Sequence, residues 1–193
     1  MKTIKISYKD IPNFLTIMRA ILVLPFAIIM YKIYEYEYSI NWILIAIFLI
    51  IIGSDILDGY IARKFNCSSD IGAKLDIISD SIYTILSMIL LAYIKITPSW
   101  FVLILIMKLL EFVVTSKILN INQSRKNQPI FDMTGKISVS IVMLLPGMFV
   151  FRCVIYEYKY MMNIIVYIIT IMLIISFINR IMDVIEIIRI KKK

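Results

Sequence analysis

Four aspartates stand inside stretches of sequence that are otherwise almost continuously apolar. Asp55 and Asp58 lie in one apolar run, and Asp76 and Asp80 lie in the next. A carboxylate near the centre of a membrane helix costs roughly 2.5–3.5 kcal/mol on insertion scales, so four of them need positive partners. The i, i+3 and i, i+4 spacings put each pair on one helix face. Two antiparallel helices joined by a short loop would bring these faces together as a cage of carboxylate oxygens.

The charge of this cage predicts a metal site. The cations that lie close in sequence are Arg63, Lys64 and Lys74, too few to balance four carboxylates. Histidine is absent, and the two cysteines, Cys67 and Cys153, form no CxxC pair, which excludes a Cys/His zinc site. Carboxylate oxygens are the hard ligands that Mg²⁺, Mn²⁺ and Ca²⁺ prefer. We therefore expect one or two divalent cations at the aspartates.

The elements that position the aspartates are predicted to be membrane helices. The chain has 193 residues, 61% of them hydrophobic, far above the roughly 45–50% of a soluble domain. A span takes about 20 residues. We expect an all-α polytopic membrane protein with one domain over residues 1–193 and a short interfacial helix before the first span. Its six transmembrane helices are placed at 12–33, 42–63, 72–95, 98–118, 136–156 and 161–188.

The distribution of basic residues predicts the topology. Lys and Arg gather at both termini and in the loops near 64–71 and 116–135, whereas the opposite ends of the spans carry few. The positive-inside bias then places both termini in the cytoplasm, and the aspartates in the cytoplasmic half of the bilayer. The net charge of +8 is spread over the ends of apolar runs, so we expect no nucleic-acid partner. The abundance of Ile, Lys and Asn fits an AT-rich bacterial genome, so we expect the membrane to be a bacterial cell membrane.

The aspartates belong to a longer pattern, D-x2-D-G-x2-A-R-x8-G-x3-D-x3-D, which runs from Asp55 to Asp80. This pattern resembles, without a departure, the signature of the CDP-alcohol phosphatidyltransferase family. The resemblance implies a six-helix membrane enzyme, usually a homodimer, with two Mg²⁺ or Mn²⁺ ions held by all four aspartates. It also implies that Asp80 accepts a proton, and that Gly59, Arg63 and Ser69 contact the CDP part of the lipid donor.

The resemblance further implies a reaction, the transfer of a phosphatidyl group from CDP-diacylglycerol to an alcohol with release of CMP. Asn13, Thr16 and Arg19 are three apart, as in the first helix of the phosphatidylglycerophosphate synthases of this family, and Gly135 and Lys136 resemble the start of their fifth helix. Glycerol 3-phosphate is therefore the expected acceptor. The candidate acceptor-binding residues are Asn13, Arg19, Lys136 and Arg125.

Several basic residues allow a second interpretation. For Arg125 a role in topology is favoured over acceptor binding. Arg19 is favoured to point inward to the cavity, with a snorkelling side chain as the alternative. Where a glycerophosphate synthase is expected to carry an Arg-Glu pair, this chain has Lys108 and Glu111, whose spacing fits either a buried structural ion pair or a substrate role. Arg180 and Asp183 are most simply a pair on one helix face.

Two further classes of function stay open alongside the enzyme. Carboxylates inside membranes also mark ion paths, so a divalent-cation transporter is the main alternative. Such transporters often have inverted repeats and broken helices, and the sequence shows neither. A catalytically silent scaffold would keep the fold without the chemistry, but every position of the signature is filled. Within the enzyme class, a phosphatidylglycerol, serine or an inositol phosphate are the other acceptors.

Overall fold

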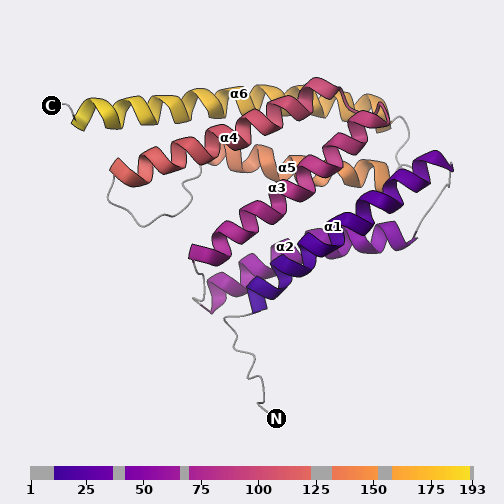
Figure 1. Ribbon diagram of the computed structural model, residues 1–193. Helices are drawn as coiled ribbons and strands as arrows, with labels where there is room; N and C mark the ends of the chain where they lie inside the picture. Colours follow the sequence, from indigo (N-terminus) through magenta and orange to yellow (C-terminus); the bar gives the residue numbers. More distant parts are fainter. Residues whose placement is uncertain (1–10, 37–41, 66–69, 123–131, 152–157, 192–193) are drawn as a thin grey trace, which may run out of the picture. The chain divides into compact units, whose positions relative to one another are not determined.

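The protein is described by a computed structural model that covers residues 11–36, 42–65, 70–122, 132–151 and 158–191. These residues form helices and connecting turns, with no strand among them. The helices are α1 Ile11–Glu35, α2 Trp42–Lys64, α3 Asp70–Tyr93, α4 Ser99–Asn122, α5 Met133–Val150 and α6 Tyr158–Lys191 (Figure 1). The expected all-α class is confirmed, with one helix at each predicted span. The proposed interfacial helix, residues 1–10, lies outside the described part of the chain.

Five of these helices, all except α4, contain stretches long and apolar enough to cross a membrane. Large apolar side chains such as Leu24, Ile28 and Ile171 are exposed on the outside of the helices, as is required where lipid is the solvent. The chain is thus a polytopic membrane protein. The crossing of the bilayer by α4 remains a prediction.

The fifth helix differs from its predicted bounds of 136–156. It begins earlier because Asp132 caps it, with the side chain accepting a hydrogen bond from the N–H of Gly135. At the other end the N–H of Phe151 bonds to the carbonyls of Gly147 and Phe149, and the helix ends at Val150. Periodicity alone places helix ends poorly, because caps and end turns decide them.

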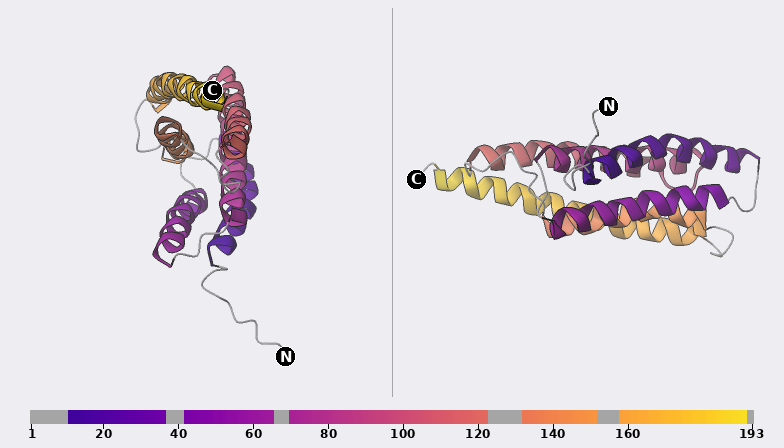
Figure 2. Two further views of the ribbon diagram at one scale, coloured as in Figure 1. Left: turned by 90° about the vertical axis from the view of Figure 1, so that its left-hand side faces the viewer. Right: turned by 90° about the horizontal axis from the view of Figure 1, so that it is seen from below.

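The chain divides into two compact units, Met1–Leu86 and Ser87–Lys193. In the first unit α1 packs against α2 (Figure 2). The Phe26 ring centroid lies 6.4 Å from that of Phe48 on α2 and 5.8 Å from that of Tyr83 on α3. This aromatic cluster is fully or nearly fully buried, and it joins the three helices of the unit. The expectation of a single domain stays a prediction.

In the second unit α4 and α5 both pack against α6. The turn before α4 is a Schellman motif, in which the N–H of Ile96 bonds to the carbonyl of Leu91 and that of Lys95 to Ala92. Lys95 takes the left-handed conformation this motif requires, with a φ of 56°. Pro98 follows, so α3 cannot continue, and α4 begins at the next residue, Ser99.

Candidate metal centre

Each of the helices α1, α2 and α3 has one buried face, here called its seam, and polar residues lie at one end of each seam. On α1 the buried positions Arg19, Val23, Phe26 and Met30 follow one another at intervals of three or four residues, the spacing of one helix face. On α2 the seam of Leu44, Phe48 and Ile51 continues to Asp58. On α3 Ser79 and Tyr83 are buried, with Asp76 and Asp80 on either side of Ser79. Packing of the apolar parts therefore brings the polar ends together.

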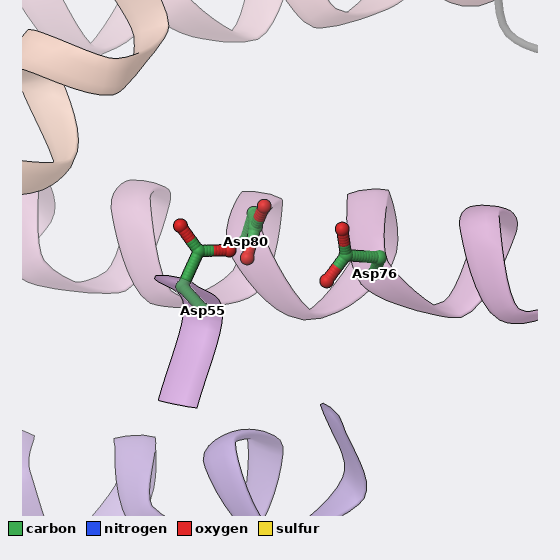
Figure 3. Close-up of side chains that lie close together, drawn as sticks. All are labelled: Asp55, Asp76 and Asp80. Carbon is green, nitrogen blue, oxygen red and sulfur yellow. The ribbon is translucent and has the colours of Figure 1, made fainter. Parts of the chain in front are cut away.

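Three of the four predicted carboxylates meet in a group that could hold a metal ion. Asp55 projects from α2 toward Asp80 on α3, and Asp76 lies one turn away on the same helix (Figure 3). One oxygen from each of the three lies within 4.8 Å of the others. Their side chains are 22–38% exposed, so the group is reachable from outside the helices.

Asp58, the fourth aspartate, lies deeper, with a side chain only 6% exposed. The hydroxyl of Thr16 on α1 donates a long hydrogen bond of 3.5 Å to Asp58 Oδ2. Ser79 on α3 in turn donates to the backbone carbonyl of Thr16 at 3.3 Å. These contacts tie the deep side of the carboxylate cluster, defined as Asp55, Asp58, Asp76 and Asp80, to α1.

Arg19 is the centre of this cluster, and its side chain is completely buried. Nη1 lies 2.7 Å from Asp55 Oδ1 and also pairs with Asp80. Nη2 lies 2.7 Å from Asp58 Oδ2 and 2.6 Å from Asp76 Oδ1. Arg63, Lys64 and Lys74 are the cations nearest in sequence, but the cation found among the carboxylates is Arg19. The neutralising residue comes from a different helix, which closeness in sequence does not reveal.

The residues fit a divalent metal by the chemistry of their donors. All four contribute carboxylate oxygens, the ligands of Mg²⁺ and Mn²⁺. The cluster already accommodates a cation, because the guanidinium of Arg19 stands among the four carboxylates. With all four ionised, four negative charges less one positive charge leave an excess of three. One buried arginine therefore does not balance the cluster.

The other predicted site residues are described only in part. Gly59 follows Asp58 on α2 and is partly buried. Lys136 is exposed in the first turn of α5, in the second unit. The side chains of Asn13 and Arg63, and all of Ser69 and Arg125, lie outside the described residues. Thr16, which contacts Asp58, was not among the predicted site residues, although its spacing of three from Arg19 had singled it out.

A second buried polar cluster lies within the second unit. Lys108 Nζ lies 2.8 Å from Glu111 Oε2, so the ion pair allowed by their spacing is present. Arg180, only 1% exposed, reaches Glu111 Oε1 at 3.1 Å and donates hydrogen bonds to Thr115. The expected pairing of Arg180 with Asp183 on one helix face was wrong. Arg180 instead contacts Glu111 on α4, and Asp183 is exposed.

Asp132, the N-cap of α5, belongs to the same cluster, because its Oδ1 lies 3.7 Å from Arg180 Nη1. Partial burial raises the pKa of this carboxyl group. Hydrogen bonds from Ser176, from the Gly135 N–H and from Thr134 lower it, as does the charge of Lys108, and the pKa lies below its usual value as a result. The ion pairs, the cap and the serine together link α4, α5 and α6.

Comparison with known proteins finds a family match over most of the chain. The family model for CDP-alcohol phosphatidyltransferase matches residues 9–180. A relative from Bacillus subtilis is 31% identical over 115 residues, which are 55% of this chain and 58% of the relative. A relative from Haemophilus influenzae is 39% identical over 82 residues, 42% of this chain and 43% of the relative. A relative from Pseudomonas fluorescens is 32% identical over 82 residues, which are 42% of this chain and 40% of the relative.

These relatives share one name, CDP-diacylglycerol–glycerol-3-phosphate 3-phosphatidyltransferase. The chain spans about half the length of the curated relatives it matches, between 40% and 58%.

Proposed function

Because the chain belongs to the CDP-alcohol phosphatidyltransferase family, we propose that it transfers a phosphatidyl group from CDP-diacylglycerol to glycerol 3-phosphate and releases CMP. The observation that carries the proposal is the convergence of Asp55, Asp76 and Asp80 from two membrane helices. The names of the relatives support the donor and the acceptor. A phosphatidylglycerol, serine and an inositol phosphate are the competing acceptors.

The carboxylate cluster is proposed to bind two Mg²⁺ or Mn²⁺ ions. Two divalent ions bring four positive charges against the four carboxylates, whereas Arg19 brings one. When bound, such a pair polarises the donor pyrophosphate and stabilises charge on the leaving oxygen. The three partly exposed aspartates meet a substrate first, and the buried Asp58 holds the cluster to α1 through Thr16.

Asp80 is the proposed proton acceptor for the incoming alcohol. The alcohol oxygen forms a bond to the phosphorus that carries diacylglycerol, and the bond from that phosphorus to the CMP oxygen breaks. The hydroxyl proton passes to the Asp80 carboxylate, and CMP leaves with the electron pair. Asp80 is the least exposed of the three partly exposed aspartates, at 22%, so its carboxylate remains accessible to a substrate while most of the side chain is covered by protein.

The remaining assignments complete the proposal. Gly59, Arg63 and Ser69 contact the CDP group, and Asn13, Arg19, Lys136 and Arg125 are candidates for the acceptor phosphate. The protein lies in a bacterial cell membrane with both termini in the cytoplasm, where water-soluble glycerol 3-phosphate is available. It works as a homodimer.

The test measures CMP release from CDP-diacylglycerol in detergent–lipid micelles with magnesium. Each acceptor is supplied in turn and the lipid products are resolved. Asp58→Asn and Asp80→Asn should each lower the rate by at least about a hundredfold, the usual range for a general acid–base group or a charge-stabilising contact. Asp183→Asn is the control, since Asp183 is exposed on α6 and should leave the rate unchanged.

Full CMP release by either variant would overturn the assignment of the cluster to the chemistry. A product formed with serine but not with glycerol 3-phosphate would correct the acceptor and keep the reaction. Uptake of Mn²⁺ into liposomes without any CMP release would favour the transporter over the enzyme.

A further inference from the structure

Arg19 occupies an uncommon position for an arginine in a membrane helix. Its side chain is 0% exposed, and its two terminal nitrogens contact carboxylates of all four aspartates. Its Nε has no hydrogen-bond partner among the described residues. Within the described part of the chain, the guanidinium is therefore held in the protein interior by the carboxylate cluster. A buried cation held in this way depends on those carboxylates for its stability.

The guanidinium and a metal ion would need the same carboxylate groups. Nη1 contacts Oδ1 of Asp55 and pairs with Asp80, while Nη2 contacts Oδ1 of Asp76, so every residue of the metal-competent group is engaged. A divalent ion of this class binds carboxylate oxygen at about 2.0–2.6 Å. An oxygen 2.7 Å from Nη1 that also bound an ion would place two cations within a few ångströms of each other, beside a guanidinium that is itself fully buried. Like charges at that separation repel strongly.

We propose that Arg19 is an internal counter-cation that holds the four carboxylates together before metal binds and leaves them when metal binds. The inference rests on the proposed metal centre and adds a competition to it. Without Arg19 the four carboxylates would repel one another across α2 and α3. With it, each incoming divalent ion must first displace a positive charge that is already paired.

The displaced guanidinium needs another anion, because an unpaired buried arginine is costly. A phosphate group of a bound substrate has the geometry for two parallel hydrogen bonds from arginine. The exchange therefore connects the two roles that Arg19 can have. It balances the carboxylates in the metal-free protein and binds phosphate in the loaded one.

The experiment measures Mn²⁺ binding and thermal stability for the full chain in detergent micelles, after metal has been removed with a chelator. Free Mn²⁺ is followed by its electron paramagnetic resonance signal, so no enzymatic turnover is needed. Arg19→Gln removes the competing charge. Arg19→Lys keeps the charge on a single nitrogen that cannot contact four carboxylates at once. Lys74→Gln is the matched control, because it removes one positive charge from an exposed position on α3.

Arg19→Gln should bind Mn²⁺ more tightly than the wild type by about 5- to 150-fold, the usual range of coupling between two ligands. It should also melt at a lower temperature without metal and gain more from added Mn²⁺, since metal binding stabilises the folded state. Arg19→Lys should change in the same direction by less. Lys74→Gln should stay within about twofold of the wild type, because exposed charges are screened.

The exchange is refuted if the wild type binds Mn²⁺ and the Arg19 variants bind it no more tightly. A role of Arg19 in packing alone predicts that refuting result, with the melting temperature lowered equally with and without metal. Should Arg19→Gln fail to fold, Arg19→Lys decides the question by the same comparison. Absence of Mn²⁺ binding in the wild type would overturn the metal centre itself, and the exchange with it.

Discussion

Replacement of Gly135 by alanine should destabilise the protein, and the same replacement at Gly53 should stabilise it. A Cβ atom added at Gly135 would lie 2.6 Å from Asp132 Oδ1 and 2.6 Å from Ser176 Oγ, closer than carbon and oxygen can approach. A Cβ at Gly53, within α2, would meet nothing within 4 Å. One methyl group therefore has opposite effects at two helical glycines of the same chain.

The size of each effect follows from the contacts. At Gly135 the methyl group displaces Asp132, whose carboxylate caps α5 through the 2.7 Å bond from the Gly135 N–H. Loss of an N-cap costs about 1 kcal/mol. Overpacking against Ser176 adds about 1–3 kcal/mol. The better helix propensity of alanine returns up to about 1 kcal/mol. The net loss is about 1–4 kcal/mol, whereas Gly53→Ala keeps only the propensity gain of about 0.5–1 kcal/mol.

The assay is unfolding of each variant in the same detergent micelles, followed by circular dichroism. A double variant sharpens it, because Ser176→Ala removes one of the two oxygens that the new methyl group would touch. Ser176→Ala should therefore cost less in the Gly135→Ala protein than in the wild type, and the difference measures the clash. A Gly135→Ala protein as stable as Gly53→Ala would refute the reasoning, since it would show that the cap and Ser176 can yield at no cost.

Three further substitutions test the second unit. Glu111→Ala removes the carboxylate that pairs with both Lys108 and Arg180, and it should lower the free energy of unfolding by about 3–5 kcal/mol because two cations stay buried; a loss below about 1 kcal/mol would show that the pairs contribute little. The pKa of Asp132 is lowered in the folded protein, so its ionised form stabilises the fold above the unfolded pKa of about 3.9, and this contribution is lost as pH falls through the lower folded pKa. The difference in melting temperature between wild type and Asp132→Asn should accordingly shrink as the pH is lowered from about 5 toward 3, and a constant difference would contradict the assignment. Lys95→Gly should raise the free energy of unfolding by about 1 kcal/mol, because glycine adopts a φ of 56° without the steric cost that a side chain adds; Lys95→Ala, which keeps that cost, should show no such gain.

Much of the candidate site could be predicted from the sequence because its information is local. Asp55 and Asp58, and Asp76 and Asp80, are spaced to share one face of a helix, and apolar runs of the right length surround both pairs. Helical periodicity and the cost of a charge in a membrane are enough to bring such residues together. The same holds for Lys108 and Glu111, whose i, i+3 spacing allowed the ion pair that the structure contains.

The counter-charge of the cluster was decided by the tertiary structure. Arg19 is 36 residues from Asp55 and 61 from Asp80, and it meets them because its seam on α1 packs against α2 and α3. Arg180 likewise reaches Thr115 across 65 residues, where the sequence indicated only its near neighbour Asp183. Spacing along one helix determines which residues share a face. Which helix supplies the opposite charge depends on how the apolar faces pack. The sequence of an apolar helix face does not identify the helix against which it packs.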